Sequence, residues 1–125
     1  MKIILLSEER IRLEGGAGPL SIESASAETS YSPFHMLASA VASCTYSVLA
    51  AWGTHAHLPF DGLAVEVGWS FAEDPHRVGT LDVVLDWPGL PAERRAAAER
   101  AAALCPVSRT LEHPPHLHLG VKDAG

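Results

Sequence analysis

The chain has 125 residues, of which 47% are hydrophobic and 19% charged, and its formal net charge is −6. This length suits a single domain over residues 1–125, and the composition supports a packed core and argues against disorder. The 9 Lys and Arg residues are scattered, so no basic cluster predicts nucleic acid as a partner.

The first residues, MKIILLSEERIRL, contain an apolar run too short for a signal peptide, and charged residues follow it at once. We therefore expect a cytoplasmic, reducing environment. The two cysteines, Cys44 and Cys105, are then expected to be free thiols or a redox-active pair rather than a structural disulfide.

The chain is predicted to begin with two strands. Residues 2–13 form the first, broken or bent around residues 7–10. Gly and Pro residues within 15–19 mark a turn, and residues 20–24 form a short second strand. We expect the two strands to pair as a hairpin.

The longest apolar stretch, residues 32–52 (SPFHMLASAVASCTYSVLAAW), predicts a buried helix. It contains no Asp, Glu, Lys or Arg. Ser32 is suited to the N-cap and Pro33 to the first turn. Gly53 and Pro59 supply the stop.

This helix is long enough to span a bilayer, since about 20 apolar residues suffice. However, no basic residues flank it and polar residues dilute it, namely His35, Ser39, Ser43, Thr45, Tyr46 and Ser47. We therefore expect a core helix and no membrane. A short chain cannot easily cover such a helix on every side, so we expect a sheet on one side and a second copy of the chain on another. The alternative is an ordinary core helix of a monomer.

The second half of the chain predicts a hairpin and two helices. Residues 63–71 and 77–87 form antiparallel strands around a loop at 73–75. A helix over residues 92–104 follows Pro91. Cys105 and Pro106 interrupt it, residues 106–111 restart as a short helix, and residues 116–121 form a last strand. This order predicts an α+β domain with an antiparallel sheet on one face of the helices.

The local environments of the two cysteines favour Cys105 as the nucleophile, because the thiolate is the reactive form. Cys105 precedes the helix at Pro106, whose first N–H groups should lower the pKa of the thiol, and Arg109 one turn on adds positive charge. Cys44 lies among apolar residues, and burial raises the pKa of a thiol. The alternative is that both cysteines are small buried hydrophobes.

The stretch from Ser32 to Trp52, followed by CPVSRTL at Cys105, resembles the OsmC/Ohr family of small thiol-dependent peroxidases. The similarity covers most of the chain from Pro33 onward, and includes the hairpin LAVEVGWSF…RVGTLDVVLDW. It implies an OsmC-like α+β fold that forms an intertwined homodimer. In this family the two long central helices pack together and the active sites lie at the subunit interface.

The resemblance also implies roles for the two cysteines. Cys44 attacks an organic hydroperoxide or hydrogen peroxide and becomes a sulfenic acid, which Cys105 resolves as a disulfide. An external dithiol supplies the electrons, and no metal or organic cofactor is needed. This assignment reverses the ranking that the local environments give.

One departure from the family pattern bears on activity. Many members have a Glu directly after the helix-starting proline, paired with an Arg that activates the thiolate, but here that position is Phe34. Either His35 or an arginine substitutes, the candidates being Arg10, Arg12 and Arg109, or peroxidase activity is lost and the fold is kept. In the second case the chain is a non-catalytic protein that binds a small apolar ligand. A purely structural dimerisation domain is a third and less attractive reading.

Histidines and aromatic residues are assigned simpler roles. His116 and His118 share one face of the predicted last strand, but a metal site also needs a third ligand, so we expect surface histidines and no metal. The remaining histidines near helix or chain ends are His55, His57 and His113. The large aromatic residues are expected in the core or lining a pocket for an organic tail, namely Trp52, Trp69, Trp87, Phe60 and Phe71.

Overall fold

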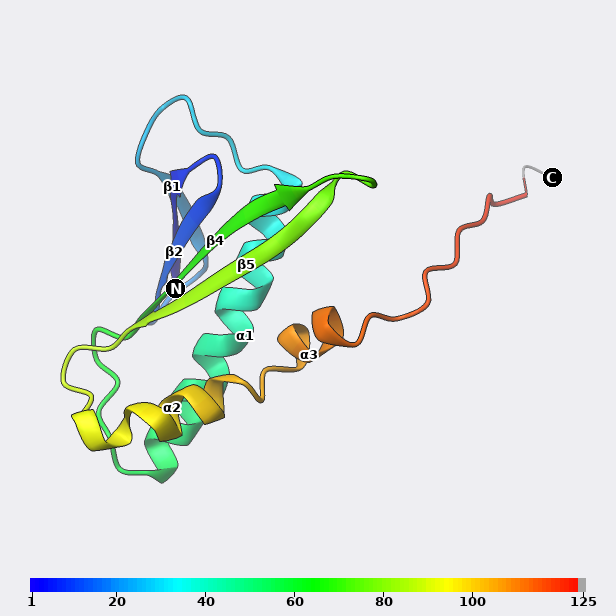
Figure 1. Cartoon of the computed structure of the whole chain (residues 1–125). Helices are drawn as coiled ribbons and strands as arrows, with labels where there is room; N and C mark the ends of the chain where they lie inside the picture. Colours follow the sequence, from blue (N-terminus) through cyan, green and yellow to red (C-terminus); the bar gives the residue numbers. More distant parts are fainter. Residues whose placement is uncertain (124–125) are drawn as a thin grey trace.

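The computed structural model describes residues 1–123, which form one five-stranded sheet packed on a long helix (Figure 1). The predicted α+β class is confirmed. The strands lie in the order β3-β1-β2-β4-β5. The elements are β1 (Lys2–Ser7), β2 (Arg10–Glu14), β3 (Ser21–Ser24), α1 (Pro33–His55), β4 (Ala64–Ala72), β5 (Arg77–Asp86), the 3-10 turn η1 (Ala92–Arg94), α2 (Arg95–Ala102) and α3 (Pro106–Glu112).

The N-terminal strands pair differently from the prediction. The stretch of residues 2–13 folds back on itself as β1 and β2, which pair antiparallel with Ile3 opposite Leu13. The predicted hairpin with residues 20–24 is wrong, because β3 runs parallel to β1 with Ile22 beside Ile3. The reason is topological: β4 occupies the other edge of β2, so the chain must cross to the free edge of β1.

Helix α1 begins at Pro33, as predicted, and its first turn is closed by a capping box. Ser32 Oγ accepts the N–H of His35 at 3.3 Å, and His35 Nδ1 accepts the N–H of Ser32 at 3.1 Å. The helix does not stop at Gly53 but continues to His55. Gly53 is buried with ring atoms of Phe60 and Trp87 at 3.4 and 3.5 Å from where a Cβ would lie, so it serves close packing rather than termination.

The core lies between α1 and one face of the sheet. Small residues of α1 allow the helix to approach the strands closely. The buried residues are Ile3, Leu5, Ile11, Leu13, Ala38, Val41, Ala42, Val65, Val67 and Trp69. A second cluster under α2 consists of Leu49, Leu63, Trp87, Ala98 and Ala101.

Residues 1–123 leave the opposite side of α1 partly exposed. Met36 is 49% exposed, and Ala40, Ser47 and Ala51 are also exposed. Among residues 1–123, α1 is the one helix whose length and composition would allow it to cross a membrane, but its other side forms the core of this fold.

The C-terminal half follows the prediction until its last element. β4 and β5 form the expected antiparallel hairpin, with Val65 opposite Leu85, and α3 begins at Pro106. The helix predicted over residues 92–104 consists of η1 and α2. The predicted strand over residues 116–121 is wrong: it pairs with no strand among residues 1–123, and Leu119 is 91% exposed. The segment leads away from the sheet in Figure 1, so no strand edge is within reach.

A close approach at Gly15 gives a test of this packing. A Cβ at Gly15 would overlap the phenol ring of Tyr46 on α1, whereas a Cβ at Gly16 would meet nothing within 4 Å. We expect Gly15→Ala to lower the free energy of unfolding by about 1–3 kcal/mol through overpacking. Gly16→Ala, the matched control, should be neutral or stabilising by up to about 1 kcal/mol. Urea denaturation measures both, and equal stabilities of the two variants would contradict this packing.

Candidate functional site

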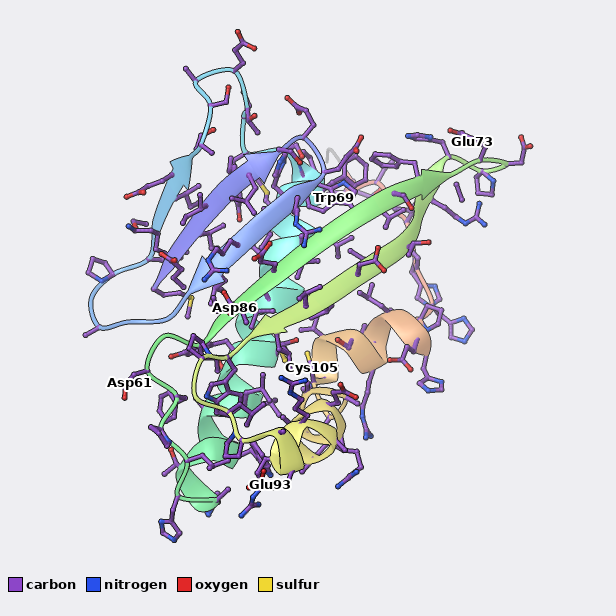
Figure 2. The ribbon with its side chains drawn as sticks, turned by 60° about the vertical axis from the view of Figure 1, so that its left-hand side comes forward. Asp61, Trp69, Glu73, Asp86, Glu93 and Cys105 are labelled. Carbon is purple, nitrogen blue, oxygen red and sulfur yellow. The ribbon has the colours of Figure 1, made fainter. Side chains whose placement is uncertain are left out.

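The two cysteines are brought together by the contact of α3 with the middle of α1. Cys44 lies halfway along α1 and is partly exposed, whereas Cys105 is the N-cap of α3 and is fully buried. Figure 2 shows Cys105 where α3 begins, after the chain has turned back from α2. Both cysteines are free thiols, and the two side chains lie close enough to interact.

Hydrogen-bond donors converge on the sulfur of Cys105. The backbone N–H of Ser108 donates to Sγ at 3.4 Å, as the N-cap position requires. Burial alone would raise the pKa of this thiol, but interactions with Cys44, Ser108 and Thr45 outweigh it and lower the pKa below its usual value. Cys105 is therefore favoured as a thiolate.

The sulfur of Cys44 has the opposite tendency. Burial raises the pKa of its thiol, and the neighbouring Cys105 raises it further, while the backbone N–H of Val107 acts in the other direction. The pair therefore carries its first negative charge on Cys105. The assignment of peroxide attack to Cys44 stays a prediction.

His35 lies away from the thiols. It is nine residues before Cys44 on the same helix, which is half a turn in angle and about 13 Å along the axis. Its Nδ1 accepts the N–H of Ser32, so Nε2 carries the hydrogen and donates to the carbonyl of Ser7 at 2.9 Å. The ring packs edge-on against Trp69, with centroids 5.0 Å apart. His35 therefore closes the start of α1 and connects it to β1.

Arg10 and Arg12 lie on the far face of the sheet. Their neighbours Ile11 and Leu13 face α1, so the two arginines face away from the helix layer that holds the thiols. They bind carboxylates there, with Arg10 3.2 Å and Arg12 2.9 Å from Glu66. Arg12 also contacts Glu14 and Asp86.

Arg109, which the sequence predicts to add positive charge near Cys105, lies on α3 four residues after Cys105. Its backbone N–H donates to the Cys105 carbonyl at 3.0 Å, one helical turn later, and the residue is exposed. Phe34, at the position where the family often has Glu, packs edge-on against Phe71 with ring centroids 4.9 Å apart. An apolar contact therefore replaces a charge at the start of α1.

Sequence reasoning missed Thr45 and Ser108. Ser108 stands three residues after the N-cap Cys105, and this spacing is the signal that could have identified it. Thr45 follows Cys44 directly, but only the fold shows that its side chain reaches Cys105.

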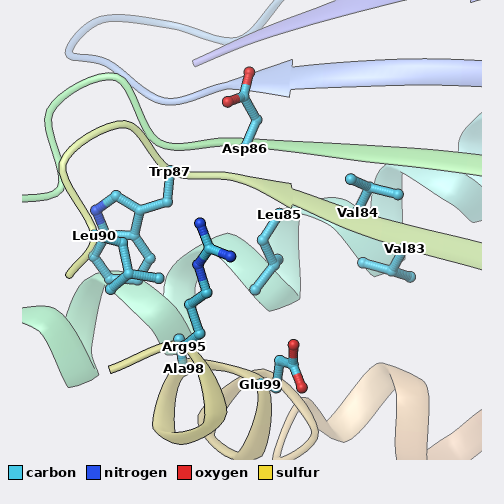
Figure 3. Close-up of a pocket in the computed structure, with 9 residues that line it drawn as sticks. All are labelled: Val83, Val84, Leu85, Asp86, Trp87, Leu90, Arg95, Ala98 and Glu99. Atoms are coloured by element: carbon cyan, nitrogen blue, oxygen red, sulfur yellow. The ribbon is translucent and has the colours of Figure 1, made fainter. Parts of the chain in front are cut away.

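Two adjacent cavities are lined in part by residues of β5. The larger, 590 Å³, contains neither cysteine and is lined by Val83, Val84, Leu85, Asp86, Trp87, Leu90, Arg95, Ala98 and Glu99 (Figure 3). The smaller, 240 Å³, shares Val83, Leu85 and Glu99 with it and also reaches Thr45 and Ser108. Thr45 and Ser108, which interact with Cys105, thus line a cavity that adjoins the larger one, and both cavities combine apolar side chains with charged ones.

Figure 3 shows how the larger cavity is arranged. The guanidinium of Arg95 lies between Trp87 and Leu85, and the carboxylate of Asp86 points to the opposite side of the strand. Of the aromatic residues predicted to line a pocket, Trp87 does so, while Trp69 belongs to the core against α1.

Over residues 1–123 no three His, Cys, Asp or Glu side chains gather as a metal site would require. The rings of His116 and His118 lie with centroids 6.3 Å apart in the exposed C-terminal segment.

The arrangement defines a class, a small α+β protein with two adjacent thiols between its long helix and a short C-terminal one. Residues 26–120 match the family model of OsmC-like proteins, and the chain belongs to this family. A solved structure from Psychrobacter arcticus 273-4, named for osmotic stress induction and a detoxification response, matches with a TM-score of 0.60 and 25% identity. The match covers 67% of this chain and 61% of that chain. Comparison with curated proteins gave no match.

These comparisons confirm the OsmC-like fold that the sequence predicts.

The acidity of the two thiols can be compared directly. In Cys44→Ser, the remaining Cys105 is expected to have a lower pKa than Cys44 has in Cys105→Ser, because Ser108 and Thr45 still donate to its sulfur and the new hydroxyl at position 44 can replace the lost thiol donor. In Cys105→Ser, the remaining Cys44 is expected to ionise at higher pH, because burial disfavours its charge. Thiolate absorbance in the ultraviolet, followed over pH, measures both. The reverse order would contradict the site described here.

Proposed function

We propose that this protein is a thiol-dependent peroxidase that reduces organic hydroperoxides or hydrogen peroxide in defence against oxidative stress. The observation that carries the proposal is the pair of adjacent free thiols, one of them favoured as a thiolate, in an OsmC-like fold. A thiolate beside a second thiol is what peroxide reduction through a disulfide requires.

In the proposed reaction, the sulfur of Cys44 attacks the terminal oxygen of the hydroperoxide. The O–O bond breaks, the alcohol leaves, and Cys44 becomes a sulfenic acid. Cys105 then attacks the Cys44 sulfur and displaces hydroxide, which leaves a disulfide. An external dithiol reduces this disulfide, so neither a metal nor an organic cofactor takes part. Partial exposure of Cys44 and full burial of Cys105 support this division of roles.

The cavities along β5 support an organic substrate. Val83 and Leu85 line both cavities, and the smaller one is also lined by Thr45 and Ser108, the two residues that interact with Cys105. An apolar tail would lie along this surface and bury area against it, which favours organic hydroperoxides over hydrogen peroxide.

The proposal includes a homodimer. The exposed side of α1 presents Met36, Ala40, Ser47 and Ala51, and small residues of this kind allow two helices to pack closely. A second copy of α1 is the natural cover for an uncharged helix face. The partner would also bring side chains toward the partly exposed Cys44. We expect this dimer to act in the cytoplasm, without nucleic acid or membrane as partner.

A second candidate function is binding without catalysis. Phe34 replaces the usual acid, and Arg10 and Arg12 are engaged with carboxylates on the far face of the sheet. A protein that lacks an activating cation would keep the cavities and bind a small apolar ligand.

Peroxide turnover separates the two functions. With cumene hydroperoxide and excess dithiothreitol, we expect Cys44→Ser to lose turnover, because the attacking sulfur is gone. Cys105→Ser should stop after one turnover with Cys44 trapped as a sulfenic acid. Thr110→Ala on the exposed side of α3 is the matched control and should keep wild-type turnover. Equal slow peroxide loss in the wild type and the three variants would refute the peroxidase function and favour binding without catalysis.

The dimer is tested by a charge placed on α1. We expect the wild type to sediment as a dimer and Ala40→Arg to sediment as a monomer, because a buried unpaired guanidinium is costly. Ala96→Arg, on the exposed surface of α2, is the control and should remain dimeric. A monomeric wild type in analytical ultracentrifugation would refute the dimer.

A further inference from the structure

We propose that Cys105, before it resolves the sulfenic acid, serves as the base that takes the proton from the thiol of Cys44. This inference rests on the peroxidase function proposed above and assigns Cys105 a second catalytic role in it.

Cys44 needs a base because its surroundings within its own chain do not ionise it. Burial raises the pKa of its thiol, and no Lys or Arg among residues 1–123 offsets this effect. Arg10 and Arg12 are on the other face of the sheet, and His35 is half a helical turn and about 13 Å away. Among residues 1–123 of the same chain, the proton acceptor in direct contact with Cys44 is the sulfur of Cys105.

Cys105 is suited to be that acceptor. Its sulfur is held by the N–H of Ser108 at 3.4 Å and interacts with the hydroxyl of Thr45, so negative charge is stabilised there. It interacts with the thiol of Cys44 directly. It is also 0% exposed, so it cannot itself meet a hydroperoxide while α3 is in place. The buried sulfur of Cys105 is therefore placed to hold negative charge, and the partly exposed sulfur of Cys44 is placed to contact the hydroperoxide.

The proton and electron balance of the step is complete. The proton of the Cys44 thiol moves to the Cys105 thiolate, and the new Cys44 thiolate attacks the terminal oxygen of ROOH. An S–O bond forms, the O–O bond breaks, and the alkoxide RO⁻ takes the proton from Cys105 and leaves as ROH. Cys44 has then lost two electrons to the peroxide, and Cys105 is a thiolate again. It attacks the Cys44 sulfur, the disulfide forms, and hydroxide leaves.

Other charged groups near the pair define the competing explanation. Glu99 of α2 and Glu112 of α3 line the 240 Å³ cavity with Thr45 and Ser108. Arg109 lies on the exposed side of α3, and the inward residues of β5 at this point, Val83 and Leu85, carry no charge. A carboxylate of Glu99 or Glu112 is therefore the alternative base, and each is removed in the test.

The experiment measures the first step alone. Reduced protein is mixed with cumene hydroperoxide, and oxidation of Cys44 is followed by dimedone trapping and mass spectrometry over a pH series. The proteins are the wild type, Cys105→Ser, Cys105→Asp, Glu99→Gln and Glu112→Gln. Ser and Asp are both good N-cap residues, so α3 keeps its first turn in either variant.

We expect Cys105→Ser to slow oxidation of Cys44 by about 100-fold at neutral pH, the lower end of the usual effect of losing a general base, because removal of Cys105 also lowers the pKa of Cys44. The deficit should shrink as the pH rises and Cys44 ionises by itself. Cys105→Asp restores a base and should recover most of the rate without forming a disulfide. Glu99→Gln and Glu112→Gln should oxidise at the wild-type rate.

Equal first-step rates in the wild type and Cys105→Ser at neutral pH would overturn the base role and leave the peroxidase intact. Slow oxidation in a glutamate variant with normal oxidation in Cys105→Ser would assign the base to that carboxylate instead. No oxidation of Cys44 in the wild type would overturn the peroxidase itself. If Cys105→Ser does not fold, the pH dependence of the wild type is the test. The proposal predicts that the rate of Cys44 oxidation rises with the first of the two thiol ionisations of the pair. A rate that rises only with the second thiol ionisation overturns the proposal.

Discussion

The contact between the start of α3 and the middle of α1 is the constraint on which the site depends. Pro106 ends the preceding segment and begins α3, so the chain turns at Cys105 and directs the first N–H groups of the new helix toward α1. The backbone N–H of Ser108 then donates to the sulfur of Cys105. The backbone N–H of Val107 acts on the sulfur of Cys44 and lowers the pKa of its thiol. The first turn of α3 thus contacts two sulfurs that are distant in the sequence, and its N–H groups help to make Cys105 the more acidic of the two.

The sheet divides the chemistry of the protein into two faces. Its inner face is apolar and packs on α1, while its outer face carries the ion pairs of Arg10 and Arg12 with Glu66 and Asp86. Arg10 and Arg12 are therefore engaged on the side opposite the thiols. In the helix layer, Ser108, Thr45 and the second sulfur interact with Cys105, and the carboxylates of Glu99 and Glu112 line the adjoining cavity. This distribution of charge fits the loss of the acid at Phe34.

The sequence was informative where local physics decides the structure. Ser32 and Pro33 determine where α1 begins, the alternation in β4 and β5 determines their pairing, and Pro106 determines where α3 begins. It was uninformative where a strand or side chain pairs with a residue distant in the sequence. The parallel pairing of β3 with β1 depends on which strand edge is free, and no local pattern encodes this. The segment around Leu119 has the alternation of a strand but pairs with no strand in the described part of the chain, residues 1–123. The interaction of Thr45 with Cys105 likewise depends on the fold of three helices.

The most direct test of the central claim is to map the disulfides after the reduced protein has reacted with one equivalent of cumene hydroperoxide. Peptide mass spectrometry under non-reducing conditions identifies the linked cysteines, and the mass of the intact chain shows whether the link is internal. We predict that Cys44 and Cys105 of the same chain become joined and that both thiol hydrogens are lost. Recovery of both cysteines as free, alkylatable thiols with the peroxide unconsumed, or a link only between different chains, would contradict the account.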